Sequence, residues 1–441
     1  MGSQAQIVPL QQESLTPHWS LANRVVFRFC FVYFGLYCIF TQVFGGLISI
    51  PKMESIDLSS LWPMRQITFW TAAHIFHAKL PLVYSGSGSG DKTFDWALTF
   101  CLLVIAILAT AIWSALDRRR ENYVALNKWF RVFIRFSLAS QLVGYGMDKA
   151  IPLQMPFPYL TRLIEPFGNF SPMGVLWSSI GASPAYEMFA GCAELLGGIL
   201  LIVPRTAMLG ALICLADMTQ VFILNMTYDV PVKLFSFHLL LMALFLLAPE
   251  FQRLTDFFFR GRTVMPSTQP QLFQTRRANR IAIALQFAFG LWMLGTAAYG
   301  GWDDWHTYGG GRPKSALYGI WNVDELSIDG QIRSPLLTDY DRWHRAVFDF
   351  PEAMAFQRMD NSIAYYTVSI NAKDNTLVFT KGSDKNFKGT FTFQRVSPDE
   401  LILDGDMDGH KTHMLLRLVD RSKLTLVSRG FHWIQEYPIN R

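Results

Sequence analysis

The sequence of 441 residues is poor in charged side chains and in cysteine, and it lacks the common cofactor motifs. Charged residues make up 17% of the chain, whereas an ordinary soluble protein contains about 25%. All five cysteines lie inside apolar segments, so they form no disulfide framework from which a redox compartment could be inferred. There is no CxxC, no CxxCH, no iron–sulfur spacing and no dinucleotide fingerprint. Redox chemistry in this chain therefore requires a diffusible quinone or a partner protein.

Long apolar segments are abundant instead. Half of the residues are hydrophobic, the mean hydropathy is +0.21, and crossing about 30 Å of hydrocarbon takes about 20 such residues in a helix. The pattern predicts a polytopic α-helical membrane bundle whose spans cover residues 24–48, 95–115, 130–150, 185–203, 207–227, 231–248 and 281–299. Residues 61–80 mix aromatic residues with Arg65, His74, His77 and Lys79, which favours an amphipathic helix at the outer surface.

The basic residues predict the orientation of these spans. Arg118–Arg120, Arg205 and the arginines between Arg253 and Arg280 all fall in connections that lie on one side of the membrane. Lys and Arg concentrate on the cytoplasmic side, so we expect a cytoplasmic N-terminus and an extracytoplasmic C-terminal domain. Because topology accounts for the basic residues, the net charge of +5 is no evidence for nucleic-acid binding.

Carboxylates lie deep inside two of the predicted spans. Glu194 and Asp217 fall near the centres of their spans, where a charged side chain costs about 2.5–3.5 kcal/mol on insertion scales unless it faces a polar interior. Glu187, Glu194 and two glycines are spaced by four, three and four, so they share one helical face on which a neighbouring helix can approach closely. We therefore expect Glu194 and Asp217 to lie together at a helix interface, where they pair or share a proton.

A second polar set is expected near the outer surface. It comprises Asp148, Lys149, Glu187, Asp229 and Lys233, with His238 one to two turns deeper. The expected charge pairs are Lys149 with Glu187 and Asp229 with Lys233. Two interpretations stay open, namely structural pairing that lets the helices pack, and a pocket for a ligand or a proton. The two histidines at positions 74 and 77 have no third ligand nearby, so no metal site is predicted.

The chain changes character at about Ala316, where short alternating segments replace the apolar runs. Turn signals such as Asp329-Gly330 and Asp408-Gly409 separate these segments, which predicts a small antiparallel β-barrel or sandwich. The expected strands are Tyr318–Leu326, Arg345–Phe350, Ala364–Ile370, Thr376–Thr380, Gly389–Gln394, Glu400–Leu403, His413–Leu418 and Lys423–Ser428.

The first of these strands resembles the lipocalins. Gly319-Ile320-Trp321 is similar to their Gly-x-Trp motif. The resemblance implies that Trp321 closes the floor of the barrel and that a late arginine, here Arg429, packs over it. A barrel of this size is either filled with side chains or holds one apolar ligand.

The central spans resemble the DoxX family of bacterial and archaeal membrane proteins. The resemblance rests on Gly144 to Lys149 with Pro152, on Tyr186 to Gly198 with its Glu-x-x-Gly-Gly, and on Asn225 to Lys233. It implies a four-helix module at 129–262, in which Lys149, Glu194, Gly197 and Gly198 match the family's motifs. The expected organisation adds an N-terminal membrane region at 1–128, a loop with the seventh span at 263–310, and the lipocalin-like domain at 311–441.

Three functional hypotheses follow, and the residues alone assign no enzymatic reaction. The DoxX resemblance implies a quinone-facing or partner-recruiting subunit of a redox system in the bacterial inner membrane, with a quinone as the one cofactor to consider. The second hypothesis is a protein that binds or transports a lipophilic small molecule. The third is a membrane enzyme resembling the vitamin K-dependent carboxylase group, with Lys149 as the base. The expected partners are the lipid bilayer, redox proteins or a lipophilic ligand.

Overall fold

The computed structural model describes residues 18–53, 56–265, 271–382 and 384–440, which fall into two compact units. The helical unit comprises Met1–Gly146 and Ala193–Ala298. The barrel unit comprises Met147–Cys192 and Tyr299–Arg441. The segment at 147–192 thus groups with the C-terminal residues, although the sequence places it inside the predicted four-helix module.

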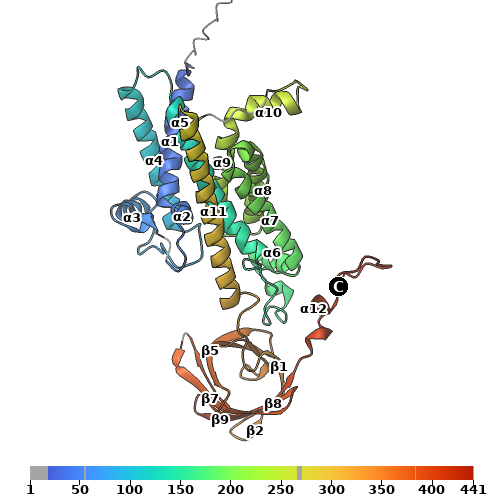
Figure 1. Cartoon of the computed structure of the whole chain (residues 1–441). Helices are drawn as coiled ribbons and strands as arrows, with labels where there is room; N and C mark the ends of the chain where they lie inside the picture. Colours follow the sequence, from blue (N-terminus) through green and yellow to red (C-terminus); the bar gives the residue numbers. More distant parts are fainter. Residues whose placement is uncertain (1–17, 54–55, 266–270, 383, 441) are drawn as a thin grey trace, which may run out of the picture. The chain divides into compact units, whose positions relative to one another are not determined.

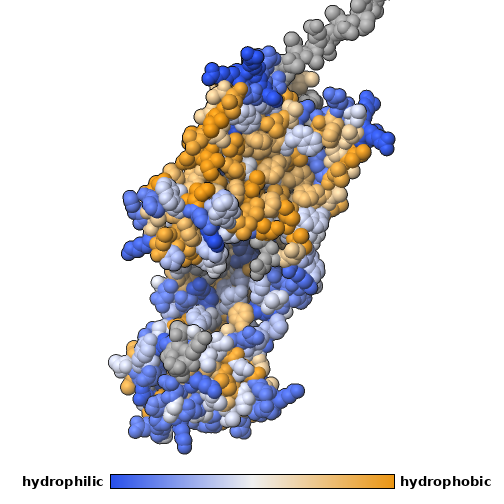
Figure 2. Space-filling view, turned by 90° about the vertical axis from the view of Figure 1, so that its left-hand side faces the viewer, coloured by the Kyte–Doolittle hydropathy of each residue, from blue (hydrophilic) through white to orange (hydrophobic). Residues whose placement is uncertain are grey.

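Every segment that the sequence predicts to span the membrane contains a helix (Figure 1). Within the described part of the chain, six helices are long and apolar enough to cross a membrane. They are Leu21–Phe40, Thr93–Leu116, Pro184–Ile202, Pro204–Thr227, Lys233–Phe258 and Arg276–Thr307. Figure 2 shows hydrophobic side chains covering a broad area of the helical unit. Such a surface is expected where helices face lipid, and helices suit this environment because they satisfy their backbone hydrogen bonds internally.

The described helices have the following bounds: α1 (Leu21–Phe40), α2 (Gln42–Leu47), α3 (Met64–His74), α4 (Thr93–Leu116), α5 (Val124–Ala150), α6 (Pro172–Gly181), α7 (Pro184–Ile202), α8 (Ala207–Thr227), α9 (Lys233–Leu247), α10 (Phe251–Phe258), α11 (Arg276–Thr307) and α12 (Thr425–Ser428). The expected amphipathic helix at 61–80 is α3, which buries Met64, Thr68, Thr71 and Ala72 and exposes Ile67 and Trp70.

Helix α5 is the predicted span that is not among the six apolar helices, and its burial explains why. Ten consecutive residues, 134–143, are buried. Rings on α5 contact α1, α9 and α11 through Phe31–Phe130, Phe130–Phe245 and Phe136–Phe289. A helix surrounded by other helices does not need an apolar surface toward lipid, so α5 tolerates its arginines and its Ser and Gln side chains.

Arginine 28 is buried on α1 and joins this helix to the end of α4. Its guanidinium donates to the Tyr123 hydroxyl at 2.7 Å, to the Asp117 backbone carbonyl at 2.8 Å and to the Ser114 hydroxyl at 2.9 Å. Tyr123 in turn donates to the Asp117 carboxylate at 2.9 Å. A buried charge is tolerated when its donors are satisfied in this way.

The C-terminal strands form a closed antiparallel barrel (Figure 1). The described strands are β1 (Gly319–Ile328), β2 (Gln331–Ile332), β3 (Trp343–Phe350), β4 (Ala353–Arg358), β5 (Ile363–Asn371), β6 (Thr376–Lys381), β7 (Asp384–Ser397), β8 (Glu400–Met407) and β9 (His410–Leu418). From β3 onward each strand pairs with the next, β1 pairs with β3, and the pairing of β1 with β9 closes the sheet. Eight strands form the barrel, and β2 is a short extension beside β1.

Two strand predictions were wrong. Strand β4, at Ala353–Arg358, was not predicted, because its Ala-Met-Ala-Phe-Gln-Arg run lacks the β-branched residues that typify a strand. Lys423–Ser428 was predicted as a strand, but Lys423 ends a 3₁₀ turn that begins at Arg421, and Thr425–Ser428 forms the helix α12. The barrel therefore already closes at β9, and the residues after it lie outside the sheet.

The barrel interior is filled with side chains. Trp343 stacks on Phe356 with ring centroids 3.4 Å apart, and Phe379 stacks on Phe391 at 5.7 Å. These rings belong to one buried cluster with leucine, valine and methionine side chains from the other strands. Alternate residues of each strand face this cluster, which is the side-chain period of a β-strand.

The tryptophan of the Gly-x-Trp motif lies at the base of this cluster. Trp321 is 1% exposed, and its indole N–H donates to the Leu317 carbonyl at 2.9 Å. The sequence predicted Arg429 as the arginine over this ring. The guanidinium 5.9 Å from the ring centroid belongs to Arg395 on β7, whereas Arg429 follows α12 and donates to Gln435. An arginine–tryptophan contact is present, but its residue was predicted wrongly because β9, not 423–428, is the last strand.

The connection between α5 and α6 packs on the outside of the barrel. Asp349, which is buried on β3, accepts hydrogen bonds from the Leu160 backbone N–H at 2.8 Å and from Arg312 at 2.6 Å. Gln357 on β4 donates to the Ile164 carbonyl at 3.1 Å. Leu160 also joins an apolar cluster with Ile320, Val347 and Ala355. These contacts explain why 147–192 and the barrel form one unit.

Candidate functional site

The seven predicted pocket residues are divided between the two units. Lys149 and Glu187 belong to the barrel unit. Glu194, Asp217, Asp229, Lys233 and His238 belong to the helical unit. Glu194 is buried and Asp217 is half-buried. Between their helices, a Cβ added at Gly197 would lie 2.9 Å from the Cys214 sulfur, so α7 and α8 approach closely at this level. On the predicted glycine face, a Cβ added at Gly198 would lie 3.1 Å from Val143, so that face packs against α5.

Glu187 is fully buried in the barrel unit. Its Oε1 accepts a hydrogen bond of 2.7 Å from the Met155 backbone N–H, while Oε2 has no hydrogen-bond partner within the described residues. The carboxylate therefore anchors the chain that follows α5. The expected pairing of Lys149 with Glu187 stays a prediction.

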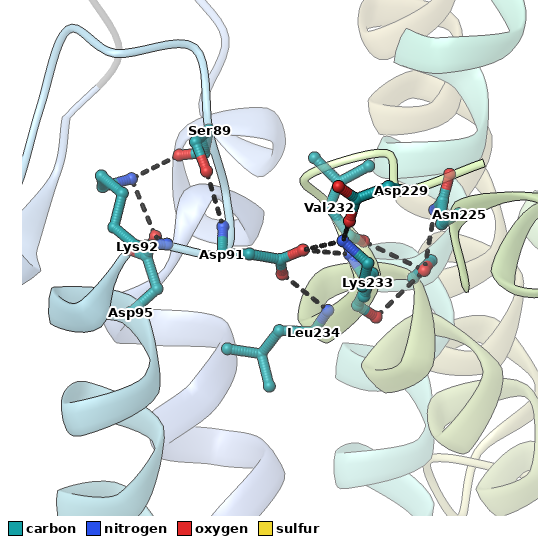
Figure 3. A network of polar contacts seen from close by, with 10 residues as sticks. Ser89, Asp91, Lys92, Asp95, Asn225, Asp229, Val232, Lys233 and Leu234 are labelled. Carbon is teal, nitrogen blue, oxygen red and sulfur yellow. Dashed lines mark hydrogen bonds and ion pairs between the residues drawn. The ribbon is translucent and has the colours of Figure 1, made fainter. Parts of the chain in front are cut away.

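The expected pair of Asp229 and Lys233 is part of a larger polar cluster in the helical unit (Figure 3). Lys233 Nζ lies 2.8 Å from Asp229 and 3.7 Å from Asp91. The Asp91 carboxylate also accepts hydrogen bonds from the backbone N–H groups of Lys233 and Leu234, both at 2.9 Å. These N–H groups open α9, so Asp91 stabilises the positive end of that helix.

The segment before α4 delivers Asp91 to this position. Gly90 donates its backbone N–H to the Pro231 carbonyl at 2.8 Å, and Ser89 accepts a hydrogen bond from the Asp91 backbone at 3.1 Å. Lys92 pairs with Asp95 at 2.8 Å. On the other side of the cluster, Asn225 donates to the Ser236 hydroxyl at 3.0 Å. The sequence analysis did not identify Asp91 as part of this cluster.

One signal could have identified Asp91. Helix α9 begins after Val232, which has no side chain able to cap it. A helix without a cap of its own needs an acceptor from elsewhere in the chain, and an aspartate at the edge of another span is suited to this role. The pairing itself is not visible in the sequence, because 142 positions separate Asp91 from Lys233.

Histidine 238 lies one turn into α9, buried against two tyrosines of α1. Its ring nitrogens lie 2.7 Å from the Tyr33 hydroxyl and 2.7 Å from the Leu234 carbonyl, and its ring stacks on Tyr37 at 3.8 Å. A carbonyl only accepts, so Nδ1 carries a hydrogen. In the neutral imidazole Nε2 is then the acceptor, and Tyr33 donates to it. Leu234 thus connects the Asp91 cluster to a buried pair of protonable groups.

The described side chains were also compared with the ligand sets that hold metal ions. No group of three or more His, Cys, Asp and Glu side chains in the described parts of the chain is arranged to hold a metal ion. His74 contacts the Trp70 carbonyl of its own helix at 2.9 Å and stacks on the Trp70 ring.

An apolar groove of about 770 Å³ lies on the helical unit, beside α5. Phe133 and Phe136 of α5 form its floor with Phe289 of α11, and Phe44 and Leu47 of α2 contribute to its rim. The polar side chain in its lining is Gln286. The Gln286 amide donates to the Ala282 carbonyl at 3.0 Å and accepts from Arg135, so its polar atoms are satisfied within the protein.

A pocket of about 610 Å³ opens at one end of the barrel. Its lining includes Arg333, Arg358, Tyr366 and Asp329, with charges of both signs. Arg358 lies 4.3 Å from the Tyr340 ring, and Arg333 pairs with Asp339 at 2.8 Å. The lining is more polar than expected for the apolar ligand that the lipocalin resemblance implies.

Comparison with known proteins gives one point of reference. No family model matches the chain, and no solved structure matches it. A segment of 123 residues, 28% of this chain, is 33% identical to the uncharacterized protein YwoB of Bacillus subtilis and covers 78% of its length. At that identity and coverage, this chain belongs to the same family as YwoB.

Proposed function

We propose that this chain is an integral membrane protein that binds a lipophilic molecule in its helical unit. The observation that carries the proposal is the apolar groove between α2, α5 and α11. Its volume of about 770 Å³ falls in the range of about 300–1,000 Å³ that is typical of small-molecule sites.

The lining of the groove suits an extended apolar chain. Three phenylalanine rings, Phe133, Phe136 and Phe289, line it, and the polar atoms of Gln286 are occupied by other protein groups. A hydrocarbon chain in such a groove leaves no polar group without a partner, whereas a polar ligand would find few hydrogen-bond partners. An acyl or isoprenoid chain is therefore the occupant that fits.

The test fills the groove and measures bound lipid. Ala278 lines the groove, so Ala278→Trp is expected to lower the amount of lipid or quinone that copurifies, as quantified by mass spectrometry of the extracted protein. Ala284→Trp is the matched control, because Ala284 is exposed on the same helix and lies outside the lining. Equal lipid content in the two variants and the parent would contradict the proposal.

A second function is favoured by one specific observation. The Tyr33–His238 hydrogen bond places two protonable groups in the apolar interior, an arrangement suited to protonating a quinone, and it supports the quinone-facing redox subunit that the DoxX resemblance implies. Quinone-dependent electron transfer in membranes containing the chain, lost in Tyr33→Phe and His238→Gln, tests this function. Activity that is unchanged in both variants would exclude a role for this pair.

A further inference from the structure

A second pocket, of about 220 Å³, lies in the helical unit near the start of α5. Its lining contains Lys128, Arg131 and Arg135. These residues are separated by three and four positions, so they lie along one face of α5. The other polar residues of the lining are Glu250, Gln271, Asn279 and Gln286. The pocket is thus built around three positive charges.

The three basic side chains donate hydrogen bonds to neutral groups. Lys128 donates to the Gln271 carbonyl and Arg131 to the Leu246 carbonyl, both at 3.0 Å, and Arg135 donates to the Gln286 side chain. Glu250 is the acid in the lining, and it also pairs with Arg253 at 2.8 Å. The lining therefore contains three basic side chains and one acidic side chain.

The burial of Arg135 is the strongest indication that the cationic pocket binds an anion. The residue is 6% exposed, and its Nε has no hydrogen-bond partner within the described parts of the chain. A buried guanidinium with a free donor and no counter-ion is costly. A bound anion would supply both the missing charge and the missing acceptor.

The cationic pocket and the apolar groove adjoin. Val132, Leu272, Ala282 and Gln286 line both of them. One molecule can therefore place a polar head beside Arg131 and Arg135 and extend an apolar chain past Phe136. The cationic pocket is lined by residues from the starts of α5 and α11, the ends of these helices that the arginine-rich connections assign to the cytoplasmic side.

We infer that the pocket binds the phosphate of an anionic lipid whose chain occupies the groove. This inference rests on the proposed binding of a lipophilic molecule and adds its head-group chemistry. Arginine is the side chain best suited to phosphate, because its planar guanidinium donates two parallel hydrogen bonds to two oxygens. The apolar stems of Lys128 and Arg131 let the charged ends reach a head group at the membrane surface.

The experiment measures head-group selectivity on the full chain in neutral detergent micelles. The probes are dioleoyl phosphatidylglycerol, dioleoylglycerol with the same chains and no phosphate, and inorganic phosphate. The parent protein is expected to bind the anionic lipid at least about tenfold more tightly than the diacylglycerol, since hydrogen bonds between charged groups carry that much discrimination. Inorganic phosphate, lacking a chain, is expected to compete only at much higher concentration.

Two variants locate the selectivity. Arg131→Gln and Arg135→Gln are each expected to lower affinity for phosphatidylglycerol about tenfold and to leave dioleoylglycerol binding unchanged. Arg131 is half-buried, so its variant remains informative if Arg135→Gln fails to fold. Arg253→Gln is the matched control, because Arg253 pairs with Glu250 at the same end of the bundle but lies outside the lining.

The outcomes separate this inference from the proposed function. Equal affinity for the two lipids, with binding still blocked by Ala278→Trp, would overturn the inference and keep the function. Binding of neither lipid would overturn both. If Arg253→Gln lowers the affinity for phosphatidylglycerol as much as Arg131→Gln does, the effect comes from general surface charge, and the proposed site is wrong. Phosphate that competes as well as the lipid would overturn the lipid as the occupant.

Discussion

Asp91 caps a helix that begins 142 positions later in the chain, through the backbone N–H of Lys233 at 2.9 Å. Its second oxygen accepts from Leu234, so one carboxylate satisfies two of the open donors of α9. The same carboxylate lies 3.7 Å from Lys233 Nζ. This aspartate therefore fixes the start of α4 against the start of α9.

Removal of this cap is expected to destabilise the helical unit. Asp91→Ala deletes both hydrogen bonds, and the loss of a capping side chain costs about 0.5–2 kcal/mol. The measurement is the free energy of unfolding in mixed detergent. Asp229→Ala is the matched control, because the Asp229 side chain is 81% exposed and an exposed ion pair contributes about 0–1 kcal/mol. A larger effect for Asp229 than for Asp91 would contradict this assignment.

Tyr33→Phe is expected to leave His238 Nε2 buried without a donor. An unsatisfied buried acceptor costs about 1–3 kcal/mol, so the unfolding free energy should fall by that amount. His238→Phe in the Tyr33→Phe background removes both partners, and a double-mutant cycle should show that the two losses do not add. Additive losses would mean that the hydrogen bond contributes nothing to stability.

The His410–Asp329 pair on the barrel predicts a pH dependence. A hydrogen bond and the charge of Asp329 raise the pKa of His410, and the same hydrogen bond lowers the pKa of Asp329. The histidine contribution is lost as pH rises through its folded pKa, and the aspartate contribution is lost as pH falls through its folded pKa. The pair therefore stabilises the barrel most between about pH 4 and 6.5, the usual pKa values of the two groups.

Because both side chains are exposed, this effect should be small and sensitive to salt. The unfolding temperature of the barrel, measured against pH for the full chain, should show a shallow maximum in that window. The maximum should disappear in Asp329→Asn. A profile that Asp329→Asn leaves unchanged would show that the pair has no effect on stability.

Trp321→Ala is expected to unfold the barrel while the helices still insert. Truncation of a buried tryptophan costs about 3–5 kcal/mol, and the lost indole also frees the Leu317 carbonyl. Limited proteolysis should then digest the C-terminal residues and spare the helical fragment. Arg395→Gln removes only the guanidinium 5.9 Å from the ring, so it should have a smaller effect. Protease resistance equal to that of the parent would contradict the role of Trp321.

The predicted orientation places the barrel outside the cell. Cysteines introduced at the exposed positions Ser334 and Gln274 test it with a membrane-impermeant maleimide in intact cells. Ser334→Cys should react and Gln274→Cys should not, until the membrane is permeabilised. The reverse pattern would invert the topology and place the barrel in the cytoplasm.

The sequence predicted the elements better than it predicted their contacts. Hydropathy located the helices because a span must be apolar over about 20 residues, and alternation located most strands for the same local reason. Asp91 escaped notice because its partners are remote in sequence, and a serine- and glycine-rich run suggests flexibility. Arg429 was chosen over Arg395 because 423–428 looked like a closing strand. The cationic pocket escaped notice because Arg131 and Arg135 fall inside the predicted span 130–150, and the sequence does not show which remote residues lie beside them.

Ten buried residues in the middle of α5 have a consequence for biogenesis. Together with Arg131 just before them, these residues bring two arginines and several hydroxyl and amide side chains into one helix. Such a helix partitions poorly into hydrocarbon when it stands alone. It can leave the translocation channel only in the company of the flanking apolar helices that will enclose it. The order of synthesis, with α1 and α4 before it and α7 to α9 after it, makes insertion of this helix a cooperative step.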